Sequence, residues 1–259
     1  MFMRTALSEN RTVPAKPVVD FHTHILPGMD DGSSNVEESI AMLLEMFRQG
    51  TMLAAATPHY YACHEKPEEF LLRRERAALA LTERIGGEKK VPGILLGAEV
   101  AYFAGMSLDA RVLDLRIEGT DLLLLEMPFS EWTQRTIREV CSLNRILGII
   151  PLIAHAERYL GLQTDEAGLW ELIESGALIQ ANAGFFTGMR TGRKALRMLG
   201  DGEIHLLGSD CHNMKARKPN LGPATAKIGG RLGGQAVDRV RRLEQDLIKD
   251  PGKSLETAE

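Results

Sequence analysis

The strongest constraint on the fold is a regular alternation of short apolar runs with longer segments of helical period. Such an alternation builds parallel sheets whose strands are joined by crossover helices. The runs are rich in Leu, Ile, Val and Ala without strict alternation, which is typical of strands buried on both faces. The predicted strands are 18–22, 53–57, 94–99, 121–126, 148–154, 178–181 and 204–209.

The segments between these runs supply the predicted helices. Ser34 and Glu37 have the spacing of a capping box, which predicts a helix from this point to Gly50. The other helices are predicted at 67–85, 132–147, 165–175, 192–199 and 236–248. An α/β barrel closes over roughly 250 residues, close to the 259 present. We therefore expect one barrel-like α/β domain over 18–250, with tails at 1–17 and 251–259.

Charge balance and cysteine content narrow the functional class. With 31 basic and 35 acidic side chains, the chain lacks the basic excess of proteins that bind nucleic-acid phosphates, so no nucleic-acid partner is expected. Three cysteines without Cys-x-x-Cys spacing predict neither a disulfide framework nor a thiolate zinc site, which favours the reducing cytoplasm. No run has the length of a signal peptide core or a membrane span, so no membrane insertion is expected.

Polar residues of metal-ligand type follow most of the predicted strands. In α/β barrels, functional residues lie at the carboxyl ends of the strands. Imidazole and carboxylate together suit Mn, Fe, Zn or Co, whereas the absence of thiolate argues against a structural zinc site. The candidates are His22, His24, His59, Glu99, Glu126, His155, Asp210 and His212, with Asp30 and Asp31 on the loop after the first pair.

The spacing within two pairs supports a shared cation. Side chains alternate along an extended chain, so His22 and His24 point to the same side and can reach one ion. Asp210 and His212 repeat this spacing after the last predicted strand. The sequence therefore predicts that both pairs face one metal centre.

The two glutamates at strand ends are candidate metal ligands, whereas the two remaining histidines are not. Glu99 and Glu126 each follow apolar residues, and a buried carboxylate is costly unless it is paired or bound to a metal. His64 lies in a polar loop, where we expect an exposed side chain. His205 lies inside a predicted strand, where we expect a core or surface histidine.

The segments that carry these residues resemble the polymerase and histidinol phosphatase (PHP) superfamily. Within it, the chain is most similar to the bacterial manganese-dependent tyrosine-protein phosphatases of capsule and exopolysaccharide operons, the CpsB/YwqE type. The Asp-Asp-Gly after His-x-His and the Ala-His-x-Glu-Arg-Tyr motif are specific to this branch. The segments are 20–32, 56–59, 97–99, 125–126, 153–159 and 208–213.

The resemblance implies a distorted (β/α)7 barrel with three divalent metal ions, Mn above all. It implies a phosphate bound by Arg158 and Arg217, with His155 and Asp210 also in catalytic positions. For the second metal ion, Asp30 is the alternative ligand to its neighbour Asp31. The implied ligands are His22, His24, Glu99 and Asp210 for one ion, Asp31, His59 and His212 for a second, and Glu126 and His155 for a third, to which Glu99 bridges.

The implied activity is hydrolysis of phosphotyrosine on a bacterial tyrosine kinase or its substrates, which would regulate capsule or exopolysaccharide synthesis. The expected partner is the tyrosine-rich tail of the kinase. Several divalent ions lower the pKa of a bridging water, so that hydroxide attacks phosphorus at neutral pH. Guanidinium groups suit bidentate contacts to phosphate oxygens.

Three alternatives remain open from the sequence. Cys211 and Arg217 have the Cys-x5-Arg spacing of cysteine-dependent tyrosine phosphatases, although the loop lacks the glycines that turn amides toward an anion. A PHP-type centre could instead hydrolyse a small phosphomonoester such as histidinol phosphate, because metal ligands alone do not choose the substrate. A non-catalytic metal-binding regulator would carry the same ligands.

Overall fold

The predicted alternation of strands and helices is confirmed. The computed structural model describes residues 18–249, and the predicted tails lie outside this range. Each of the seven predicted runs overlaps a strand, with shifts of one to three residues at most ends: β1 (Val18–Thr23), β2 (Thr51–Ala56), β4 (Gly93–Leu96), β6 (Leu122–Glu126), β7 (Ile150–Ile153), β8 (Leu178–Asn182) and β9 (Leu206–Gly208). Two short strands, β3 (His59–Tyr60) and β5 (Glu99–Ala101), follow β2 and β4 directly and carry two of the predicted ligands.

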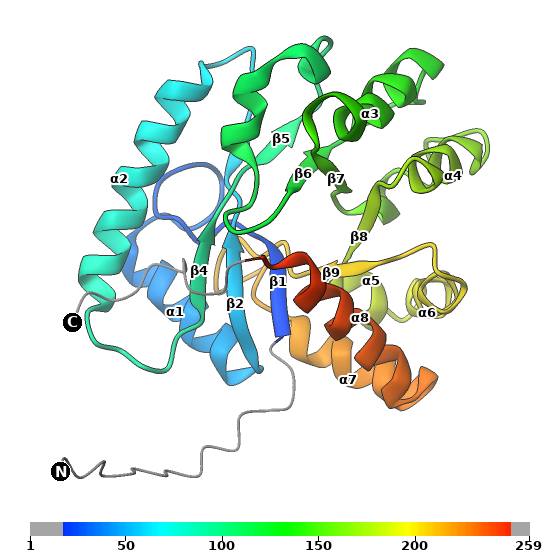
Figure 1. The fold of residues 1–259 in the computed structure, drawn as a ribbon. Coiled ribbons are helices and arrows are strands. Elements are labelled where there is room, and N and C mark those ends of the chain that lie inside the picture. The colour runs from blue at the N-terminus through cyan, green and yellow to red at the C-terminus, as the bar shows by residue number, and fades with distance from the viewer. Residues whose placement is uncertain (1–17, 250–259) are drawn as a thin grey trace, which may run out of the picture.

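All strand pairs are parallel and together form a curled sheet (Figure 1). One part has the order β1-β2-β4 and the other the order β3-β5-β6-β7-β8-β9. An isolated parallel bridge joins Thr23 at the end of β1 to Cys211 just after β9, and the His24 amide donates to the Cys211 carbonyl at 2.9 Å. The carboxyl ends of β1 and β9 therefore lie side by side.

The helices pack on the outside of the curled sheet (Figure 1). All six predicted helices are present. The bounds of α2 match the prediction, and the other five are shifted at one or both ends. Helices α5 and α7 were not predicted from the sequence. The helices are α1 (Val36–Arg48), α2 (Pro67–Ile85), α3 (Gln134–Leu147), α4 (Ala167–Glu174), α5 (Ala183–Thr187), α6 (Gly192–Asp201), α7 (Leu221–Leu232) and α8 (Gly234–Leu247).

The predicted cap of the first helix was wrong by one residue. Asn35 is the N-cap, and its side chain accepts from the Glu38 amide at 2.9 Å. The Glu38 carboxylate in turn accepts from the Ser34 amide at 3.1 Å. Asn caps a helix as well as Ser does, so the spacing alone could not choose the register.

The core explains how the strands aim side chains at the site. On β6, Leu122 and Leu124 belong to an inner cluster between the strands, whereas Leu123 and Leu125 belong to the cluster under the outer helices. This confirms strands buried on both faces. Glu126 has the parity of the inner leucines and therefore faces the interior at the carboxyl end of the strand.

Candidate metal centre

All of the predicted ligands gather at the carboxyl-terminal edge of the curled sheet. Three groups of side chains each bring ligand atoms within 4.8 Å of one another. Glu99 belongs to two of these groups and His24 to two, so the groups share members and form one continuous centre. The groups are His24, Asp31, His59 and His212; His22, His24 and Glu99; and His59, Glu99 and Glu126.

The deepest part of the centre is formed by His22, His24, Glu99 and Asp210. The Nε2 atoms of the two histidines lie 3.2 Å apart. Glu99 Oε2 lies 3.1 Å from His22 Nε2 and 3.3 Å from His24 Nε2. Asp210 Oδ1 lies 3.5 Å from both nitrogens. All four side chains are nearly inaccessible to solvent.

The second nitrogen of each histidine fixes which atom faces the centre. Gln180 Oε1 accepts a hydrogen bond from the His155 amide at 2.7 Å. Because this atom is an acceptor, His22 Nδ1, which lies 3.2 Å from it, must be the donor. Asp30 accepts from His24 Nδ1 at 2.7 Å. When a cation replaces the protons on these imidazoles, both Nε2 lone pairs face Glu99 and Asp210, and such a set of nitrogen and carboxylate atoms suits a divalent ion.

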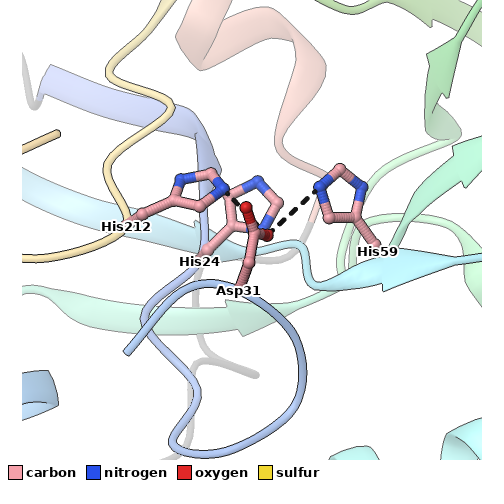
Figure 2. Close-up of side chains that lie close together, drawn as sticks. All are labelled: His24, Asp31, His59 and His212. Carbon is pink, nitrogen blue, oxygen red and sulfur yellow. Dashed lines mark ion pairs between the residues drawn. The ribbon is translucent and has the colours of Figure 1, made fainter. Parts of the chain in front are cut away.

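Asp31 lies at the exposed side of the centre, between two imidazoles (Figure 2). Its Oδ1 lies 3.3 Å from His212 Nε2 and 3.6 Å from His59 Nε2. Asp30 instead binds His24 Nδ1, the His59 amide at 2.9 Å and the Gly32 amide at 2.9 Å. Asp31 therefore faces the two imidazoles at the opening, whereas Asp30 is engaged by His24 and two backbone amides.

The third part of the centre is formed by His155, Glu99 and Glu126. His155 Nε2 lies 2.8 Å from Glu99 Oε1 and 3.4 Å from Glu126 Oε1. On the other carboxylate oxygen, Glu99 Oε2 lies 3.1 Å from His59 Nδ1. Glu99 therefore reaches all three parts of the centre, as expected for a bridging ligand.

Electrostatics in the centre are governed by the carboxylates. Burial raises the pKa of Glu99, but the His22 charge and histidine hydrogen bonds outweigh it and hold this pKa well below its usual range. Burial lowers the pKa of His24, yet Asp30 and Glu99 raise it to about 10. In the same way, Glu126 and Glu99 raise the pKa of His155 to about 9 despite burial. Protons on these imidazoles balance negative charge that divalent ions would otherwise neutralise.

Several buried polar atoms in the centre have no hydrogen-bond partner among the described residues. Buried polar atoms are normally paired, so each orphan needs a physical explanation. Bound cations would satisfy the orphaned lone pairs that face the centre, and the histidine and carboxylate donors fit divalent ions such as Mn, Fe, Zn or Co. The orphaned atoms are Glu99 Oε2, His59 Nδ1 and His212 Nε2 in the centre, and His155 Nδ1, whose ring turns its other nitrogen toward Glu99.

His212 is suited to a ligand role without losing a proton. Burial and the positive charge of His24 lower its pKa to about 4. Its Nδ1 faces the Asp210 carbonyl at 3.1 Å, which leaves Nε2 free to point at Asp31.

Backbone strain occurs at two site residues. His155 and Asp210 have φ of 33° and 52°, and among described residues they are the only non-glycines with positive φ. This conformation is costly for a residue with a Cβ atom and persists where the surrounding structure requires it. It turns the chain after β7 and β9 so that both side chains face the centre.

Gly32 allows the loop after β1 to approach His24. A Cβ atom at this position would lie 2.4 Å from both the Cβ and the carbonyl oxygen of His24. The glycine of Asp-Asp-Gly is therefore required for the close contact that places Asp30 and Asp31 against the centre.

Arg158 and Arg217 lie beside the centre and bind the two oxygens of Asp210. Arg158 pairs with Oδ2, and Arg217 Nη2 lies 2.7 Å from Oδ1. Their side chains are 37% and 36% exposed, so both guanidinium groups are also open to solvent. Two half-exposed guanidinium groups next to a buried cluster have the chemistry that suits an anion such as phosphate.

The sequence did not reveal two amides that support the ligands. Gln180 and Asn182 lie two residues apart on β8 and face the same side. Gln180 orients His22 and donates to Asn182 Oδ1 at 3.0 Å, and Asn182 donates to Asp210 Oδ2 at 2.8 Å. An amide side chain within an apolar run carries no distinctive sequence signal. The one available signal is that Gln180 and Asn182 are two residues apart, as are His22 and His24.

Replacing Gln180 with Leu should weaken metal binding while the ligands remain. His22 would lose the acceptor that fixes its tautomer, and such outer contacts typically contribute about 10- to 100-fold in metal affinity. Calorimetric titration of the metal-stripped protein with Mn²⁺ measures this change in metal affinity. Replacing the exposed Gln134 with Leu is the matched control and should leave the affinity unchanged. Equal affinities of the Gln180 variant and the parent protein would contradict the role.

The cysteine alternative does not fit the geometry. Cys211 is fully buried in the main apolar cluster. Burial and the nearby Asp20 charge raise the pKa of its thiol far above the usual range. A nucleophilic thiolate needs exposure and a lowered pKa, so Cys211 is a packing residue between two ligand positions. His64 is exposed, and His205 binds the Ile179 amide through Nδ1 at 3.1 Å, outside the centre.

The curled parallel sheet with histidine and carboxylate side chains gathered at its carboxyl edge defines a class, the α/β proteins with a candidate metal site at the strand ends. A family model described as capsular polysaccharide synthesis, CpsB/CapC, matches residues 18–248. The chain therefore belongs to the CpsB/CapC family.

Relatives and a solved structure support this assignment. Tyrosine-protein phosphatase YwqE of Bacillus subtilis is 33% identical over 205 residues, which cover 77% of this chain and 79% of that protein. Tyrosine-protein phosphatase CpsB of Streptococcus pneumoniae is 30% identical over 252 residues, with 89% and 100% coverage. A chain from the crystal structures of these two proteins, described as metal-dependent tyrosine phosphatases, superposes with a TM-score of 0.79 at 28% identity, with 90% and 95% coverage.

Proposed function

We propose that this protein is a metal-dependent protein-tyrosine phosphatase that acts in capsule or exopolysaccharide synthesis. The observation that carries the proposal is the continuous ligand centre joined by Glu99 in a member of the CpsB/CapC family. The relatives named above are tyrosine-protein phosphatases. Arg158 and Arg217 beside this centre suit a phosphoryl group.

The proposed centre holds three divalent ions, with Mn as the expected metal. When bound, the ions supply an acidified water as nucleophile and neutralise phosphate charge. The three groups of clustered side chains support most of each ligand set, although the third group contains His59 where the proposed set has His155. The distances from His22 and His24 to Asp210, and from His155 to Glu99 and Glu126, support the two remaining ligands. We assign His22, His24, Glu99 and Asp210 to one ion, Asp31, His59 and His212 to the second, and Glu126, His155 and the shared Glu99 to the third.

The chain's own residues would bind and orient the substrate. Arg158 and Arg217 would donate to phosphate oxygens and give up part of their contact with Asp210. Asp210 and His155 are held in strained conformations, so their side chains are fixed before substrate arrives. A phenolate leaves readily because the pKa of a phenol, about 10, lies well below that of an alkyl alcohol. Strong help from a general acid is therefore not required.

We also propose that the curled sheet is a distorted (β/α)7 barrel within one domain. The bridge between Thr23 and Cys211, next to the hydrogen bond from the His24 amide, supports closure between β1 and β9. Three free cysteines support a cytoplasmic location. No helix among residues 18–249 is long and apolar enough to cross a membrane.

The proposed substrate is phosphotyrosine on a flexible protein segment, such as the tyrosine-rich tail of a bacterial tyrosine kinase. The ligands lie largely buried beneath the edge of the sheet, and Asp31 at the opening is 65% exposed. A phosphotyrosine must extend into such a site, which a disordered tail does more easily than a folded surface.

Metal add-back to stripped protein tests the proposal. Chelator-treated protein should not hydrolyse a phosphotyrosyl peptide, and single additions of Mn, Fe, Zn or Co should restore turnover, with Mn expected to be the most effective. Histidinol phosphate is the comparison substrate and should be hydrolysed with a lower kcat/KM. Turnover that survives chelation, or preference for histidinol phosphate, would refute the proposal. Metal bound without turnover of either substrate would indicate a non-catalytic regulator.

A further inference from the structure

An exposed aromatic ring lies directly beside the metal centre. Phe129 follows β6, three residues after Glu126, and remains 55% exposed. One side of the ring stacks on His155, with centroids 5.9 Å apart and planes at 22°. Tyr159 supports it at 5.3 Å. A large apolar side chain at the opening of a charged site is left half uncovered.

The loop that carries Phe129 is held on both sides of this residue. The Met127 amide donates to the Tyr159 hydroxyl at 3.0 Å. The indole of Trp132 donates to the Pro128 carbonyl at 3.2 Å. The backbone next to Phe129 is therefore anchored before any ligand binds, which lowers the entropic cost of using this residue as a contact surface.

A second aromatic ring stacks on His59, as Phe129 stacks on His155. Tyr61 stacks on this imidazole with centroids 5.5 Å apart and planes at 26°. His59 and His155 approach opposite oxygens of Glu99, at 3.1 Å and 2.8 Å. The two aromatic side chains therefore accompany the two imidazoles that flank one carboxylate.

We propose that Phe129 and Tyr61 form an aryl-binding subsite that selects phosphate esters of phenols over those of alkyl alcohols. The inference rests on the proposed phosphatase function, because it assumes that a phosphoryl group occupies the centre. An aryl group attached to that phosphorus must leave the centre through its opening, where it meets these rings. Aromatic pairs in stacked or edge-to-face geometry bind beyond the effect of area alone. An alkyl chain offers no such face.

The subsite explains a selectivity that metal ligands cannot provide. Metal ions and guanidinium groups bind the phosphoryl oxygens, which are identical in phosphotyrosine and phosphoserine. Only groups that contact the remainder of the ester can distinguish them. Phe129 and Tyr61 are the exposed or half-exposed rings that stack on proposed ligands among residues 18–249.

Binding of two phosphonates to the Mn²⁺-loaded full chain tests the subsite without turnover. We expect phenylphosphonate to bind about 10-fold more tightly than methylphosphonate, as measured by calorimetry. Phe129→Ala should remove most of this preference and leave methylphosphonate affinity unchanged. Phe129→Tyr should restore the preference. Tyr61→Phe should retain it and Tyr61→Ala should reduce it, because the ring and not the hydroxyl is the contact.

Trp170→Ala is the matched control, since this aromatic side chain is 40% exposed on α4. It should leave both affinities unchanged. A wild-type preference retained in Phe129→Ala would overturn the subsite, as would an equal loss of affinity for both phosphonates. Because the assay needs no hydrolysis, failure of the proposed function would appear separately, in the phosphopeptide assay.

Discussion

Glu99→Gln is expected to abolish hydrolysis of a phosphotyrosyl peptide and to lower the metal content of the protein. Glu99 Oε2 faces Nε2 of His22 at 3.1 Å and of His24 at 3.3 Å, and Oε1 faces His155 at 2.8 Å. The amide keeps the shape but loses the negative charge and places an NH₂ group against bound cations. We expect kcat/KM to fall on the order of 10³-fold or more, since both the nucleophile and charge neutralisation depend on the ions.

Glu203→Gln provides a matched control for this substitution. Glu203 is also buried, but it pairs with Arg197 at 3.0 Å, outside the centre. The control should keep its metal content and its kcat/KM. Elemental analysis of protein loaded with Mn²⁺ and dialysed, together with thermal unfolding, separates loss of metal from loss of fold. A Glu99→Gln protein with full metal content and normal turnover would contradict the bridging role.

The position of the centre could be predicted because parallel strands present their carboxyl ends at one edge of a sheet. A histidine or carboxylate at the end of most of the apolar runs is a strong signal, since such residues are costly in a core without a partner. His22 and His24, for example, required only the alternation of an extended chain. His155 and Asp210 reach the same centre through strained backbone, which no pattern in the sequence announces.

The choice between Asp30 and Asp31 depended on the loop that carries them. Adjacent residues point in different directions, and the sequence does not state the direction. The close approach of Gly32 to His24 turns Asp30 toward His24 Nδ1 and leaves Asp31 facing His59 and His212. A contact between backbone segments therefore sets the directions of the two carboxylates, and this direction favours Asp31 as the proposed ligand.

Helix α7 was missed because its residues have low intrinsic helix propensity. Leu221–Leu232 includes Pro223 and three glycines, which in isolation disfavour a helix. Leu221, Ala224 and Ile228 are nevertheless buried in the second apolar cluster. Their spacing of three and four is the helical period, and packing against neighbouring helices stabilises what local propensity does not.

Arg158→Ala should reduce kcat/KM for a phosphotyrosyl peptide by about 10²- to 10³-fold, the range found when one donor to developing negative charge is removed. Unlike Glu99→Gln, it should leave the metal content close to that of the parent protein, because Arg158 contacts Asp210 without belonging to a ligand group. Arg158→Lys should recover only part of the activity, since an ammonium group cannot form the two parallel contacts of a guanidinium group.

Arg197→Ala is the control for removing an ion-paired arginine, because Arg197 pairs with Asp201 at 3.1 Å and with Glu203, on α6 and just after it. It should retain full activity. Competitive inhibition by inorganic phosphate locates the defect: the inhibition constant should rise in Arg158→Ala if the guanidinium binds phosphoryl oxygens. If activity fell while phosphate inhibition and metal content stayed unchanged, Arg158 would act through the position of Asp210 and not on the substrate.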